Sequence, residues 1–132
     1  MSEVYFDHEK LIVYQRAMEF SGWVADNISE IQIKNSIIDQ LDRAPSSIAL
    51  NIAEGNWKFT GRDRCRYLDI ARGSALECSS CLDIMLVKRM IEKSVQVQGK
   101  NILKEIVSML VGLIKANSDR AYENQTEYNS TS

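Results

Sequence analysis

Two short motifs decide the fold: Asn51-Ile52-Ala53-Glu54-Gly55 and Ile70-Ala71-Arg72-Gly73-Ser74-Ala75-Leu76-Glu77. Each motif sets one or two polar or charged residues among small and apolar residues at helical spacing. Asn51 and Glu54 are three positions apart, so they share one face of a helix. The motifs therefore predict closely packed helices with a few polar side chains between them.

Apolar residues recur at steps of three and four along four segments, which predicts four amphipathic helices. These helices are expected at residues 8–27, 34–54, 60–90 and 98–117. The fold class is therefore all-α, an antiparallel up-down four-helix bundle with short loops. Pro45 lies inside the second segment without interrupting its apolar period, so a kinked helix is expected there. Gly55 is predicted to end that helix, Asp7 to cap the first, and Thr60 with Asp63 to begin the third as a capping box.

The first and third helices carry more apolar surface than a monomeric surface helix needs. In the first helix the predicted core face consists of Leu11, Tyr14, Met18, Ser21, Ala25 and Ile28, and a second stripe consists of Val13, Ala17, Phe20 and Val24. In the third helix a second stripe consists of Leu68, Ala75 and Leu86. These surplus stripes predict that the chain self-associates, without fixing the number of subunits.

Length and composition predict one soluble domain. The chain has 132 residues, of which 45% are hydrophobic and 26% charged, enough for a core of ordinary size. We expect a bundle domain over residues 1–118 and a disordered polar tail over residues 119–132. No apolar run approaches the roughly 18 residues that span a bilayer, and the first residues do not resemble a signal peptide. A cytoplasmic location is expected.

Charge is distributed unevenly along the chain. The formal net charge is −2 and the pI about 5.4, which is unlike most nucleic-acid-binding proteins. Residues 56–72, however, hold five basic residues against two acidic ones, a balance of +3. The basic side chains in and around this segment lie among aromatic ones; the group comprises Lys58, Arg62, Arg64 and Arg66 with Trp57 and Phe59. Cations pair with phosphates and aromatic rings stack on unpaired bases, so the group is a candidate nucleic-acid contact. The alternative is a solvated helix face, with the aromatic rings packed on the end of the bundle.

Asn51, Glu54, Arg72 and Glu77 are the other polar residues that stand out. We interpret them as a structural network in which buried or interfacial charges pair with one another. An active site with Glu54 and Glu77 as acid and base is the weaker alternative. A carboxylate di-metal bundle needs Glu-x-x-His motifs, and the sequence has none.

Three cysteines, Cys65, Cys78 and Cys81, are expected to be small core residues rather than a metal or redox site. Cys78 and Cys81 have the spacing of a metal pair but lie in the middle of a predicted helix, and the single histidine is in another segment. We therefore predict no metal, no cofactor and no enzymatic activity.

The sequence resembles the four-helix-bundle family encoded in intervening sequences of bacterial 23S ribosomal RNA genes. The resemblance covers about residues 6–115 and rests on Leu11, Val13-Tyr14-Gln15, Ala17, Glu19-Phe20, Asp39-Gln40-Leu41, Arg43-Ala44, Ser47-Ile48, Tyr67-Leu68 and the two motifs quoted above. It implies a ring-shaped homopentamer without established enzymatic activity. The accessory protein of diversity-generating retroelements, which binds nucleic acid and a reverse transcriptase, is a relative in fold.

Together these observations predict a non-enzymatic oligomeric binding or scaffold protein. Its expected partner is structured RNA or a ribonucleoprotein, contacted through a basic rim. The alternative is a protein-interaction adaptor that does not bind nucleic acid, and no membrane or small-molecule partner is expected.

Overall fold

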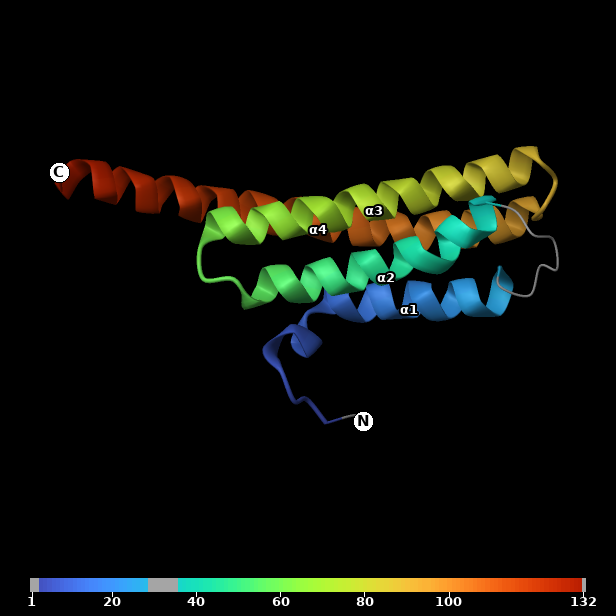
Figure 1. Cartoon of the computed structure of the whole chain (residues 1–132), viewed down its shortest axis with the longest axis horizontal. Helices are drawn as coiled ribbons and strands as arrows, with labels where there is room; N and C mark the ends of the chain where they lie inside the picture. The colour runs from blue at the N-terminus through green and yellow to red at the C-terminus, as the bar shows by residue number, and fades with distance from the viewer. Residues whose placement is uncertain (1–2, 29–35, 132) are drawn as a thin grey trace.

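The computed structural model describes residues 3–28 and 36–131, with side-chain surroundings as far as Ser118. Its elements are a 3-10 helix and four α-helices: η1 (Asp7–Lys10), α1 (Ile12–Asn27), α2 (Ser36–Trp57), α3 (Gly61–Val87) and α4 (Lys93–Thr131). Successive α-helices run in opposite directions along one long axis (Figure 1). The described residues contain no strand. The predicted antiparallel four-helix bundle is confirmed.

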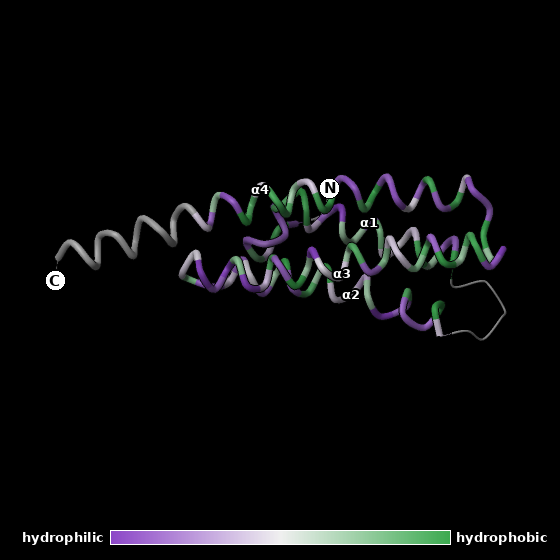
Figure 2. The backbone as a smooth tube through the Cα atoms, turned by 90° about the horizontal axis from the view of Figure 1, so that it is seen from above, coloured by the Kyte–Doolittle hydropathy of each residue, from purple (hydrophilic) through white to green (hydrophobic). Residues whose placement is uncertain are grey.

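Each helix packs against its two neighbours in a closed order, α1 with α2, α2 with α3, α3 with α4, and α4 with α1. The contacts of α3 with α2 and α4 are much more extensive than those of α1. All four helices contribute to the core, in which Phe20, Ile48, Leu82 and Ile106 are fully buried. Hydrophobic and hydrophilic residues alternate along every helix, as amphipathic helices require (Figure 2). No helix within the described ranges is both long and apolar enough to cross a bilayer.

The first helix begins later than the sequence predicts. Residues 7–10 form η1, and Leu11 follows in an extended conformation with φ −70° and ψ 125°. The Glu9 carboxylate accepts hydrogen bonds from the backbone N–H groups of Tyr5 (3.0 Å) and Phe6 (2.5 Å). These bonds stabilise a separate turn, so the prediction that Asp7 caps α1 is wrong.

The two apolar stripes of α1 exchange the roles predicted for them. The stripe of Val13, Ala17, Phe20 and Val24 is buried in the bundle. In the stripe predicted as the core face only Ile28 is buried, and Met18 is 51% exposed. The buried stripe holds branched and aromatic side chains, which fill the core better than Ser21 and Ala25. In α3 the second stripe belongs to the same core, because Leu68 and Ala75 are buried.

Helix α2 continues without a break through Pro45, and the Pro45 side chain is buried. Its axis bends between the cyan N-terminal part and the green C-terminal part, as the prediction of a kinked helix requires (Figure 1). The predicted start, at residue 34, lies outside the described residues. The helix does not end at Gly55 but continues to Trp57. A Cβ at Gly55 would lie 3.2 Å from the Tyr67 Cβ and 3.3 Å from the Arg64 carbonyl oxygen, so this glycine allows α2 and α3 to approach closely.

The ends of α3 are fixed by local hydrogen bonds. The Thr60 hydroxyl accepts a bond from the Asp63 N–H at 3.1 Å, which makes Thr60 the N-cap and supplies one of the two bonds of the predicted capping box. The helix ends at Val87, slightly before the predicted end at residue 90. Arg89 has a positive φ of 61°, and the N–H groups of Arg89 and Met90 bond back to the carbonyls of Leu86 and Met85. This is the Schellman arrangement, which stops a helix.

Helix α4 begins at Lys93, before the predicted residue 98, and its backbone continues past the predicted end at Asn117 to Thr131. Residues 113–131 include neither glycine nor proline, so no strong helix breaker ends the helix at Asn117. The division into a domain of residues 1–118 and a disordered tail of residues 119–132 stays a prediction.

Candidate nucleic-acid interface

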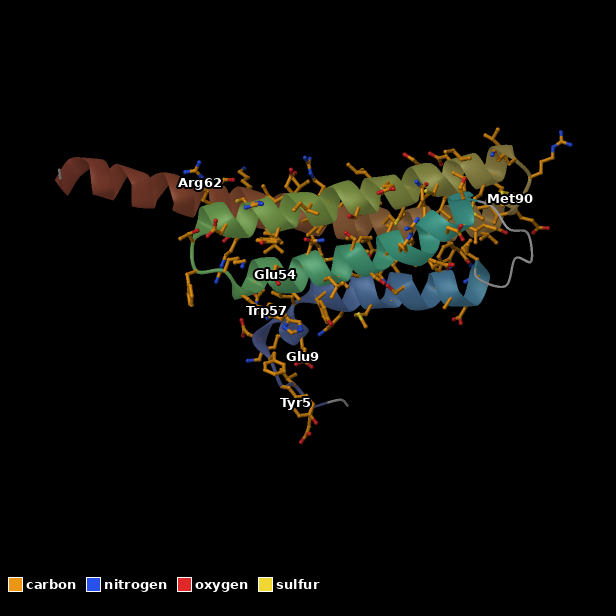
Figure 3. All side chains as sticks on the ribbon, viewed as in Figure 1. Tyr5, Glu9, Glu54, Trp57, Arg62 and Met90 are labelled. Carbon is orange, nitrogen blue, oxygen red and sulfur yellow. The ribbon has the colours of Figure 1, made fainter. Side chains whose placement is uncertain are left out.

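The basic and aromatic group lies at one end of the bundle, where the chain turns from α2 into α3. Glu54, Trp57 and Arg62 lie together at this end, and Met90 lies at the opposite end (Figure 3). The turn is fixed from both sides. The Lys58 N–H donates to the Gly55 carbonyl at 3.2 Å, and the Arg64 Nε donates to the Lys58 carbonyl at 2.7 Å. Arg64 therefore stabilises this turn and also carries a positive charge.

The other three cations have different surroundings. Lys58 Nζ lies 3.2 Å from the Glu54 carboxylate and 5.1 Å from the centre of the Tyr67 ring. The Arg66 guanidinium lies 5.8 Å from the centre of the same ring, a position that allows cation–π attraction. Arg62 and Arg66 have no carboxylate partner among residues 3–28 and 36–118. Two positive charges are thus left unneutralised on the first two turns of α3.

Asp69 lies three residues after Arg66 on α3 but pairs with Arg72 instead. Asp69 Oδ1 accepts two bonds from Arg72, from Nε at 3.1 Å and from Nη2 at 2.8 Å. Arg72 lies three residues farther along the same helix, so it forms a short local pair with Asp69. Asp69 is therefore occupied by Arg72, and Arg66 has no carboxylate partner among residues 3–28 and 36–118.

The two aromatic rings of the group differ sharply in exposure. The Phe59 side chain is 101% exposed and packs on nothing in the described part of the chain. Trp57 is 55% exposed, and its Nε1 donates to His8 Nδ1 at 3.1 Å. The interpretation in which both rings pack on the bundle end therefore fits Trp57 in part and does not fit Phe59. The Phe59 ring gains no burial free energy when the chain folds and would gain it if a partner covered the ring, which makes Phe59 a candidate contact for a partner.

The four residues expected to form a structural network are not paired with one another in the single chain. The Asn51 amide donates to the Ser47 carbonyl at 2.8 Å, Glu54 pairs with Lys58, and Arg72 pairs with Asp69. Glu77 is exposed and lines a polar hollow that also includes Arg43 and Ser74. Glu54, Arg72 and Glu77 are all partly or fully exposed to solvent, so no buried charge requires them to pair with one another.

The cysteines occupy the positions predicted for core residues. Cys78 and Cys81 are buried, and Cys65 is half-buried with its thiol 3.4 Å from the Ile114 carbonyl oxygen. Burial raises the pKa of the Cys78 thiol to about 12. No group of three metal-binding side chains comes together among the described residues.

The sequence did not predict two buried polar residues near this interface, His8 and Asn117. His8 is 8% exposed and lies edge-on to Tyr14 and Trp57, with ring centres 4.8 and 5.3 Å away. Asn117 is also 8% exposed. Asn117 continues the helical spacing of the buried residues Leu103, Ile106 and Leu110. A polar residue at a position where this spacing predicts a buried side chain could have been recognised in the sequence.

Comparison with known proteins agrees with this architecture. The family model of the 23S rRNA-intervening sequence proteins matches residues 9–112. The chain belongs to this family. A crystal structure from Bacteroides thetaiotaomicron VPI-5482, of a protein of unknown function in the S23 ribosomal protein family, superposes with a TM-score of 0.74. The superposition covers 79% of this chain and 96% of the other at 23% identity, so it supports the fold alone. No curated protein matches the sequence.

Proposed function

We propose that this family member is a cytoplasmic, non-enzymatic RNA-binding scaffold that contacts structured RNA or a ribonucleoprotein through the turn between α2 and α3. The observation that carries the proposal is that Arg62 and Arg66, which pair with no carboxylate among residues 3–28 and 36–118, closely follow the fully exposed Phe59 in the chain. We call these three residues, with Trp57, Lys58 and Arg64, the basic rim.

The chemistry of the basic rim suits RNA. Arginine side chains bind phosphate oxygens in two-pronged geometry, and an exposed aromatic ring stacks on unpaired bases whatever their sequence. The arginines also lie at the N-terminal end of α3, where the helix dipole adds positive potential. The local positive charge should direct RNA to this end of a chain whose net charge is slightly negative.

Assembly would strengthen the same site. The resemblance to the intervening-sequence proteins implies a homopentameric ring, and we propose that this chain assembles in that way. A ring repeats the basic rim once in every subunit. Repeated weak contacts on one ligand raise the overall affinity far above that of one copy.

Replacing Arg62 and Arg66 with glutamine tests the proposal. The double variant should bind an RNA hairpin more weakly, and the slope of log affinity against log salt should become shallower by about 0.7–0.9 for each phosphate that the variant no longer binds. Fluorescence anisotropy across a salt series measures both quantities. Arg64 stays unchanged, since it holds the turn.

Lys88 and Arg89, exposed at the other end of α3, provide the matched control. Changing both to glutamine removes the same charge and should leave RNA binding almost unchanged. Equal losses in the two variants would mean that net charge, and not the basic rim, controls binding. No binding by the wild-type protein at low salt would contradict the proposed function.

A protein-interaction adaptor is the second candidate. It is favoured by the net charge of −2 and by the exposed apolar side chains of Val4, Tyr5 and Phe6 before η1. Under this function a pull-down should retain one specific protein after nuclease treatment, whereas an RNA-dependent partner would be lost.

A further inference from the structure

A cavity opens at the same end of the bundle as the basic rim. Its volume is about 220 Å³, and residues from α2, α3 and α4 line it. Its walls are largely apolar and include Ile52, Leu68 and Leu113. A cavity of about 150 Å³ already accommodates a benzene ring. The space therefore suits one planar ring system and is smaller than most drug-sized ligands require.

Three polar side chains also line the cavity: Asn56, Arg64 and Asn117. Asn117 is more than nine-tenths buried, and its Nδ2 donates to the Leu113 carbonyl at 2.8 Å. Asn56 makes only a long bond of 3.5 Å to Asp7. The side chains of Asn56, Arg64 and Asn117 can offer amide and guanidinium N–H donors and amide oxygen acceptors to a ligand in the cavity.

The cavity is continuous with the basic rim. Arg64 lines the cavity through α3 and braces the Lys58 carbonyl in the turn. Gly55 and Asn56, which also line it, directly precede Trp57 in the chain. Arg62 and Arg66 lie about 160° around α3 from Arg64, so a polymer whose phosphates lie on them would reach the cavity around the N-terminal end of α3.

We propose that this cavity binds a single unpaired base of the RNA held by the basic rim. The inference rests on the proposed function and makes it more specific: the preferred ligand is an RNA with a bulged or looped-out nucleotide, not a continuous duplex. The apolar walls enclose the ring faces. Amide and guanidinium groups meet the edge of the base, which presents both donors and acceptors when it is unpaired.

Three RNA hairpins of the same stem test this inference by fluorescence anisotropy. One has a single adenosine bulge, one has an abasic site in place of that base, and one is fully paired. The abasic hairpin keeps the same phosphates, so its comparison with the bulge isolates the base. We expect the wild-type protein to bind the adenosine bulge about tenfold more tightly than the abasic hairpin.

Two variants test the cavity, one by filling it and one by removing a polar group from its wall. Ala116→Phe, at an exposed position on the cavity wall, should reduce the tenfold preference to nearly one while leaving binding of the abasic hairpin unchanged. Asn117→Leu keeps the branched shape of the side chain and removes its amide group, and it should reduce the preference severalfold. Ser94→Phe, at an exposed position in the first turn of α4 at the other end of the bundle, is the control and should keep the preference.

The outcomes separate this inference from the proposed function. Equal binding of the adenosine and abasic hairpins by the wild-type protein would overturn the base site while RNA binding stands. A preference that persists in both Ala116→Phe and Asn117→Leu, with helical circular dichroism intact, would also overturn it. Absence of binding to all three hairpins at low salt would contradict the proposed function itself.

Discussion

Gly99 is a residue whose missing side chain matters for the packing of three helices. A Cβ there would lie 2.6 Å from the Trp23 Cη2 atom of α1 and 2.7 Å from the Leu82 Cδ1 atom of α3. Leu82 is fully buried, and the Trp23 ring is stacked on Phe20 with ring centres 5.7 Å apart. Overpacking costs about 1–3 kcal/mol, against about 1 kcal/mol gained when alanine replaces glycine in a helix. Gly99→Ala should lower the free energy of unfolding by about 1 kcal/mol in urea titrations.

Gly112 lies in the same helix and provides the control, because a Cβ there meets nothing within 4 Å. Gly112→Ala should raise the free energy of unfolding by about 0.5–1 kcal/mol. The pair of substitutions is chemically identical and opposite in expected sign. Equal stabilisation by both would show that the Trp23 ring moves aside at little cost.

The buried thiol of Cys78 predicts how stability depends on alkaline pH. Burial raises its pKa to about 12 in the folded state, whereas a cysteine in an unfolded chain has a pKa of about 8.5. Between these values the unfolded chain binds fewer protons than the folded one, so stability falls as pH rises. The contribution of this thiol approaches about 1.4 kcal/mol per pH unit.

Urea titrations between pH 8 and pH 10.5 measure this dependence. Cys78→Ala, although less stable at pH 8, should lose stability with pH more slowly than the wild-type protein. Cys81 and the lysines and tyrosines are present in both proteins, so their titration cancels in the difference. Parallel curves for the two proteins would show that the Cys78 thiol ionises without unfolding.

At the level of single elements, the sequence predicted which segments are helices much better than it predicted how they face one another. Four apolar periods and the Thr60 cap were enough to find four helices. The prediction of which face of α1 is buried was wrong because both of its stripes are apolar. Only the shapes of the neighbouring helices decide which stripe fills the core. Periodicity describes one helix at a time and holds no information about its partners.

Gly55 shows the same limit. In the sequence a glycine near the end of an apolar period predicts a helix stop, but here α3 passes so close that a side chain would contact Tyr67 and Arg64. The candidate site was predictable in part for a related reason. The charges and rings of the basic rim are close together in sequence, whereas the cavity that includes Asn56 and Asn117 joins residues far apart in the chain.

For the whole molecule, the apolar surface left outside the core bears on the proposed pentamer. In α1 the stripe of Leu11, Tyr14, Met18, Ser21 and Ala25 is only partly covered by the chain itself. Farther around the bundle, Leu50 of α2 and Leu76 of α3 are 69% and 48% exposed. Such side chains gain free energy when a second subunit covers them, at about 25 cal/mol per Å² of apolar surface.

Native mass spectrometry tests the assembly directly. Five chains of 15.0 kDa give a ring of about 75 kDa. Met18→Glu places a charge on the half-covered stripe of α1, where burial in an interface would be costly. It should shift the protein to smaller species and leave its helical circular dichroism unchanged. Gln15→Glu introduces the same residue at an exposed position of the same helix and should keep the ring.

The same variant connects assembly with RNA binding. Met18→Glu leaves Arg62, Arg66 and Phe59 intact, so each subunit keeps its own weak contact with RNA. If the ring multiplies these contacts, dissociated subunits should bind an RNA hairpin at least about a hundredfold more weakly, because linked sites gain affinity of that order without new contacts. Unchanged affinity in dissociated subunits would show that one basic rim is sufficient and that the assembly serves another purpose.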